Sequence, residues 1–151
     1  VMGRFEMISL HMVLYFRNSR RAGETAGLLA QEIIEAFFED IDHSIRELGI
    51  GDAGVPKRMK KLGKMFYGRA KSYEEALNAA DHQALAEALK RNIHPNSDEN
   101  APAMDRLGHY VFAADLALAN IDSENFANGT VTFLEPDISQ TGHPEADKGE
   151  V

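Results

Sequence analysis

The sequence predicts a single all-α domain of about five helices, followed by an irregular polar tail. Apolar residues recur at steps of three and four through most of the chain, which is the period of an amphipathic helix. Glycine or proline marks most breaks between these stretches. The length of 151 residues suits one domain, since domains usually have about 100–200 residues. A composition of 44% apolar and 26% charged residues excludes collagen-like, low-complexity and wholly disordered chains.

The first expected helix covers about residues 3–18 and is apolar around most of its circumference. A helix of this kind has to be buried on most sides, so we expect a central core helix. The alternative is that part of its surface meets a membrane or a partner. Its apolar run from Phe5 to Phe16 is shorter than the ~18 residues that a membrane-spanning helix needs.

Two longer helices follow, over about residues 23–48 and 56–80. Gly49 directly follows the second helix, as expected of a C-terminal stop. Pro56 opens the third helix, where proline is favoured at the first position. Gly63 and Gly68 lie inside the third helix, and each costs about 1 kcal/mol relative to alanine. We therefore expect close helix packing or a kink at these two glycines.

The remaining helices are expected over about residues 82–93, with Asp81 as the N-cap, and 102–120. Beyond Ile121 the period fades, and residues 131–134 read as a short extended piece. The last residues are polar and contain two prolines, so we expect them to be mobile. The expected division is a helical domain over residues 1–135 and a tail over residues 136–151.

No catalytic residue, metal site or cofactor is predicted. The absence of cysteine removes thiol nucleophiles and Zn–Cys sites, and the six histidines lack metal-ligand spacing. Asp40-x-x-His43 is at most half of a di-iron motif, which needs two Glu-x-x-His sequences. A metal oxidase, or a Ser–His–Asp hydrolase assembled by the tertiary fold, is the enzyme alternative. We expect neither a small-molecule substrate nor DNA as a partner. A net charge of −8 opposes non-specific binding of nucleic acid by the chain as a whole.

Basic residues gather in one stretch of the third helix. Seven of the sixteen lysines and arginines lie between Lys57 and Lys71, where there is no acidic residue. Such a strip can dock on ribosomal RNA, anionic lipid or an acidic protein face. The alternative is a solvated face paired with acids elsewhere, including the acidic stretch between Glu32 and Glu47 on the second helix. The expected partner-binding residues are Lys57, Arg58, Lys60, Lys61, Lys64, Tyr67, Arg69 and Lys71.

The glycine-rich turn and the helix after it carry a family resemblance. Residues 49–61 read GIGDAGVPKRMKK, and residues 66–70 read FYGRA. Together with residues 37–42 and 45–49, and with Tyr73, Ala76 and Leu77, they resemble the ubiquinol–cytochrome c chaperone family. The resemblance covers about residues 5–93. The combination is fairly specific, although each piece alone is weak.

This resemblance implies a non-enzymatic assembly factor. Mitochondrial members of the family assist the cytochrome bc1 complex, act on newly made cytochrome b and associate with the translating ribosome. The implied partners are a cytochrome b-like membrane protein as client, the ribosome and the membrane surface. The short chain without a visible presequence is more similar to bacterial members, which implies a place in the cytoplasm or at the periphery of the inner membrane. For a eukaryotic member it implies the matrix side. The rival interpretation is a generic RNA- or anionic-lipid-binding helical module without a dedicated client.

Overall fold

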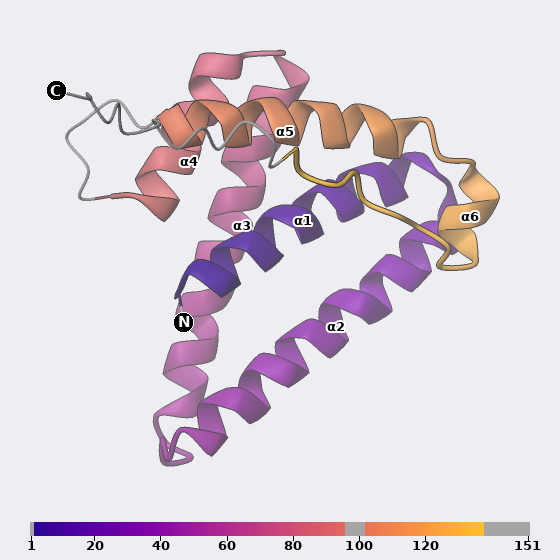
Figure 1. Cartoon of the computed structure of the whole chain (residues 1–151). Coiled ribbons are helices and arrows are strands. Elements are labelled where there is room, and N and C mark those ends of the chain that lie inside the picture. Colours follow the sequence, from indigo (N-terminus) through magenta and orange to yellow (C-terminus); the bar gives the residue numbers. More distant parts are fainter. Residues whose placement is uncertain (1, 96–101, 138–151) are drawn as a thin grey trace, which may run out of the picture.

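A computed structural model describes residues 2–95 and 102–137, and within these ranges the chain forms six helices and no strand (Figure 1). The helices are α1 (Met2–Arg21), α2 (Glu24–Glu47), α3 (Val55–Asn78), α4 (His82–Ile93), α5 (Pro102–Ala119) and α6 (Ser123–Ala127). The all-α prediction is confirmed. Residues 138–151, which make up most of the expected mobile tail, lie outside the described residues.

Helix α1 is the centre of the domain. It packs against α2, α3, α4 and α5, and Figure 1 shows it crossing between them. Leu10, Val13 and Leu14 on α1 are fully or almost fully buried, together with apolar residues from every other helix. The expectation that an all-round apolar helix forms the core is confirmed, because several neighbours share its circumference.

Two helix ends follow the sequence signals closely. The Asp81 carboxylate accepts a hydrogen bond from the backbone N–H of Ala84 at 2.9 Å, which caps α4 as predicted. Gly49 has a φ of +77° just after α2 ends. That left-handed conformation is readily adopted by glycine, so the chain can reverse there toward α3.

Helix α6 was not predicted by the apolar period, whereas residues 131–134 were expected as a short extended piece. Helix α6 has only five residues, which is too short for a periodic signal, yet it buries Phe126 and packs on α2. Residues 129–134, here called the strap, then run back along α1 without regular structure (Figure 1). The rings of Phe133 in the strap and His11 pack in a T-shaped arrangement, with their centroids 5.2 Å apart. The Tyr110 hydroxyl donates to the carbonyl of Leu134 at 3.0 Å.

At the two glycines of α3, where close helix packing or a kink was expected, the structure shows no close packing. Helix α3 continues through both positions. A Cβ atom added at Gly63 or at Gly68 would meet no other atom within 4 Å. Space for a side chain therefore remains at both positions.

The buried Tyr73 and the half-buried Tyr110 are expected to make the fold sensitive to alkaline pH. Tyr73 is almost completely buried, and its hydroxyl accepts a hydrogen bond from the Asn92 amide at 3.0 Å. Burial raises the pKa of Tyr73, and burial also raises the pKa of Tyr110. In both cases the low-polarity surroundings disfavour the phenolate.

We expect the free energy of unfolding to fall as the pH rises above about 10, the pKa of tyrosine in an unfolded chain. Below that pH both states hold the proton, so the stability is fully present. Above it the unfolded state loses the proton first, which favours unfolding. Urea unfolding of the wild type and of Tyr73→Phe between about pH 9 and pH 11 measures this slope. The variant should show a shallower decline, and equal slopes would contradict the assignment to Tyr73.

Candidate functional site

The basic residues of α3 form an exposed surface along the first two thirds of that helix. We call six of them the basic strip: Lys57, Arg58, Lys60, Lys61, Lys64 and Lys71. Within the described residues only Lys71 makes an ion pair, with the exposed Glu75 at 3.9 Å. The other five positive charges of the strip have no ion-pair partner in that part of the chain. They remain available for an anionic partner.

The acidic stretch of α2 does not neutralise the basic strip. Glu32, Glu39 and Asp40 are exposed and form no ion pair within residues 2–95 and 102–137. Asp42 pairs with Arg46 on its own helix at 2.7 Å, and Arg46 also reaches Asp52 in the following turn at 2.6 Å. The alternative that the two charged helices pair with each other is therefore not realised among the described residues.

Arg69 is placed differently from the basic strip. Its side chain is only 12% exposed and faces Glu6, whose side chain is 4% exposed. Arg69 Nε and Nη2 donate to the two carboxylate oxygens of Glu6, each at 2.5 Å, and Nη1 donates to the Met65 carbonyl at 3.1 Å. The guanidinium thus joins α3 to α1 inside the fold. Nothing in the sequence pairs these two residues, because they lie 63 positions apart.

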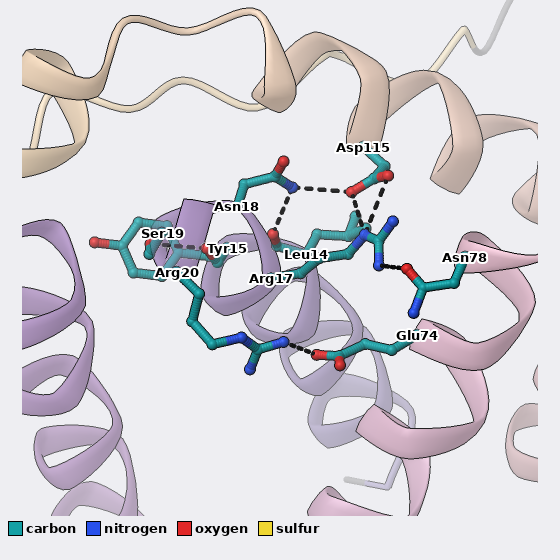
Figure 2. Close-up of polar contacts among 9 residues, drawn as sticks. All are labelled: Leu14, Tyr15, Arg17, Asn18, Ser19, Arg20, Glu74, Asn78 and Asp115. Carbon is teal, nitrogen blue, oxygen red and sulfur yellow. Dashed lines mark hydrogen bonds and ion pairs between the residues drawn. The ribbon is translucent and has the colours of Figure 1, made fainter. Parts of the chain in front are cut away.

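A second polar network ties the other end of α1 to α3 and α5 (Figure 2). The buried Arg17 side chain donates through Nε to both carboxylate oxygens of Asp115, at 3.1 and 3.3 Å. Its Nη1 donates to the Asn78 side-chain oxygen at 2.5 Å. The Asn18 amide donates to Asp115 at 2.9 Å and also to the Leu14 carbonyl. This network joins three helices, α1, α3 and α5, inside the fold.

Tyr67 stands at the edge of a groove beside the basic strip. Its side chain is 61% exposed, and it lies one helical turn from both Lys64 and Lys71. The groove has a volume of about 220 Å³ and lies where α1, α2 and α3 meet. We call it the α2–α3 groove. Its lining residues are Val13, Phe16, Arg20, Gly27, Ala30, Gln31, Ile34, Phe66, Tyr67, Ala70 and Glu74.

A second groove, called here the α1 groove, lies between α1, α2 and the strap. It has a volume of about 460 Å³ and is mostly apolar. Its lining residues are Met7, Ile8, His11, Met12, Tyr15, Ile33, Gly129, Val131 and Phe133. Ile8 is 49% exposed at its edge. Methionines adapt their shape to varied apolar partners, so this groove suits an apolar segment of variable sequence.

His11 supports the wall of the α1 groove through its hydrogen bonds. Its Nδ1 pairs with the Met7 carbonyl at 2.8 Å, and its Nε2 pairs with the Tyr110 hydroxyl at 2.9 Å. The histidine is half-buried, and its hydrogen-bonding groups have partners inside the fold. Both ring nitrogens are therefore occupied within the fold.

Two further findings concern metal ligands and membrane-spanning helices. Across residues 2–95 and 102–137 there is no group of three histidine, aspartate or glutamate side chains that could hold a metal ion. Within the same ranges, every helix is too short or too polar to cross a bilayer. The features that stand out are a charged strip and two grooves, which are suited to binding other molecules.

Comparison with known proteins adds a family and a set of relatives. The family described as ubiquinol-cytochrome C chaperone matches residues 1–133. The crystal structure of the Cbp3 homolog from Brucella abortus superimposes with a TM-score of 0.81 at 49% sequence identity. That match covers 91% of this chain and 75% of the other.

Two curated relatives carry an assembly-factor name. Ubiquinol-cytochrome-c reductase complex assembly factor 1 of Xenopus laevis is 22% identical over 121 residues, which is 80% of this chain. The protein of that name from Mus musculus is 25% identical over 107 residues, or 71% of this chain. The matched parts span 60% and 36% of those two relatives, so both are considerably longer than the region they share with this chain.

Proposed function

Because this chain belongs to the ubiquinol-cytochrome C chaperone family, we propose that it is a non-enzymatic assembly factor for the cytochrome bc1 complex. Its client is a cytochrome b-like membrane protein. The family match over residues 1–133 and the names of the two curated relatives support this role. The single structural observation that carries the proposal is the basic strip, whose charges are exposed and largely unpaired on a rigid helix.

The basic strip docks the protein on an anionic surface of the ribosome, the client or the membrane. Five of its six cations have no ion-pair partner in the described part of the chain, so binding does not require internal pairs to break. Exposed charges of one sign act over a Debye length of about 8–10 Å and speed encounters with an opposite charge. The strip therefore increases the association rate, while neighbouring contacts select the partner.

The α1 groove shields an apolar segment of the client. Its lining is mostly apolar, and Ile8 and Ile33 are exposed at the surface around it. A membrane protein that has not yet assembled exposes apolar surface that would otherwise aggregate. This protein works at the periphery of the inner membrane, on the cytoplasmic side in a bacterium or on the matrix side in a eukaryote.

The second proposal is a generic RNA- or anionic-lipid-binding module that uses the same basic strip without a dedicated client. The absence of acidic residues within the strip favours it. Such a module would bind in a strongly salt-dependent way, because neutralising phosphates releases counterions. It would also bind RNAs of any sequence alike and ignore client identity.

Cells that lack the protein are expected to lose assembled bc1 complex. The measurements are ubiquinol-cytochrome c reductase activity of isolated membranes and the lifetime of newly made cytochrome b in a pulse-chase experiment. The wild-type chain should restore both. Normal activity and normal cytochrome b turnover in the deletion strain would contradict the proposed role, whereas a general loss of RNA-dependent processes would favour the second proposal.

A further inference from the structure

The α2–α3 groove has an apolar floor made by three helices. Val13 and Phe16 come from α1, Ala30 and Ile34 from α2, and Ala70 from α3. Figure 1 shows α2 and α3 meeting at the turn that joins them and diverging from there, with α1 crossing between them. The volume of about 220 Å³ leaves room for a large apolar side chain of a partner.

The two edges of this groove carry opposite charges. On α3, three lysines share the helix face of Tyr67, because they lie one or two turns away from it along the helix. They are Lys60, Lys64 and Lys71. On α2, Gln31 lines the groove and donates to the exposed carboxylate of Glu35, one turn further on, at 2.9 Å. Glu74 of α3 also lines the groove, and its charge is paired with Arg20 of α1 at 2.6 Å. The apolar floor thus lies between the lysines of α3 and the carboxylate of Glu35 on α2.

We propose that the α2–α3 groove binds an amphipathic helix of a partner protein, whose acidic edge faces α3 and whose basic edge faces α2. The apolar stripe of that helix fills the groove beside Tyr67. This arrangement uses the known helix-in-groove mode, with flanking charges that fix orientation as they do in coiled coils. The inference rests on the proposed function, because it names the kind of partner that the basic strip receives.

The mixed charge of the groove selects a protein over RNA or lipid. A phosphate backbone or an anionic bilayer would gain from Lys60, Lys64 and Lys71 but would face the carboxylate of Glu35 on the opposite edge. Neither would fill a concave apolar floor with a single side chain. An amphipathic helix satisfies the floor and both edges at once.

Two glycines provide a matched pair of variants. A Cβ at Gly27 or at Gly68 would meet no atom within 4 Å, and both residues lie inside helices. Gly27 lines the α2–α3 groove, whereas Gly68 is exposed on α3 and is not part of its lining. Gly27→Leu therefore fills the groove, and Gly68→Leu adds the same side chain elsewhere. Both should keep or raise the melting temperature, because glycine disfavours helix.

The probe is a fluorescent synthetic helix of about five turns, or 18 residues, with a leucine stripe, glutamates on one edge and lysines on the other. Binding to the full chain is followed by fluorescence anisotropy at low salt. We expect Gly27→Leu to weaken binding by about tenfold or more, which corresponds to at least about 1.4 kcal/mol. Gly68→Leu should bind like the wild type. A peptide whose leucines are replaced by serine should lose most of its binding.

Charge exchange gives a second, independent test. A triple variant replaces Lys60, Lys64 and Lys71 by glutamate. It should bind the first peptide more weakly than the wild type does, and it should bind more tightly a peptide whose edge facing α3 is basic. The inference is overturned if the serine peptide binds as tightly as the leucine peptide, or if Gly27→Leu binds like the wild type. It also fails if the wild type binds no peptide, or if an RNA oligonucleotide or anionic vesicles compete equally well.

These outcomes separate the groove from the proposed function. If Gly27→Leu sustains bc1 assembly in cells while the lysine-to-glutamate variant does not, the docking strip stands and the groove inference fails. If cells without the protein assemble the bc1 complex normally, the proposed function fails, and the peptide measurement still decides the groove.

Discussion

Replacing Glu6 by alanine is expected to lower the free energy of unfolding by about 3–5 kcal/mol, because it leaves a buried cation without its partner. Arg69, whose side chain is only 12% exposed in the fold, would lose both hydrogen bonds to the carboxylate. The loss amounts to a large part of a typical total stability of about 5–15 kcal/mol. Urea unfolding at neutral pH measures it directly.

Two comparisons show whether burial causes this loss. Glu74→Ala breaks the 2.6 Å ion pair between Glu74 and Arg20 (Figure 2). The Arg20 side chain in this pair is 60% exposed. That change should cost only about 0–1 kcal/mol. The double variant Glu6→Met with Arg69→Met removes both charges and should recover most of the stability. Equal losses for Glu6→Ala and Glu74→Ala would contradict the difference between a buried and an exposed pair.

Changing Lys57, Lys61 and Lys64 together to glutamate is expected to reduce partner binding strongly while leaving the fold almost unchanged. These side chains are exposed and unpaired in the described part of the chain, so their removal breaks no internal ion pair. The reversal places like charges opposite an anionic partner, which slows association first. We expect capture of ribosomes, client or membranes to fall by about tenfold or more at low salt. Added salt should weaken the wild type more than the variant.

A reversal of the acidic residues on α2 serves as the control. Glu32, Asp40 and Glu47 are exposed and lie outside the α2–α3 groove lining. Changing these three to lysine alters charge by the same amount with the opposite sign, and capture should persist. If the lysine reversal lowers the melting temperature and leaves capture unchanged, the basic residues stabilise the fold and the docking proposal fails.

The sequence predicted those features that depend on neighbours a few positions apart. The apolar run of α1 required burial on most sides, whichever helices supplied it. The Asp81 cap and the turn at Gly49 depend on local backbone geometry, so their residue types alone indicated them. The exposure of the basic strip followed from its position opposite the apolar stripe of the same helix.

Other features depend on residues that are distant in the chain. Helix α6 is too short to show a period, and it is held in place because Phe126 fills a space beside Tyr15. The strap has no regular structure and lies along α1 through contacts with His11 and Tyr110. Both grooves are formed where three separate segments meet, so no single stretch of sequence indicates them.

The sequence by itself determined an all-helical chain, its main helix boundaries and a helix with one strongly basic face. Those properties arise from periodicity, caps and charge spacing, which act over one or two helical turns. Only the tertiary structure decided which charges are free to bind. Arg69 is largely buried because it pairs with Glu6 on α1. Among the described residues, no acidic side chain pairs with Lys57, Lys60, Lys61 or Lys64. The reason is physical: ion pairing needs two groups within a few ångströms, and that distance is set by helix packing and not by spacing along the chain.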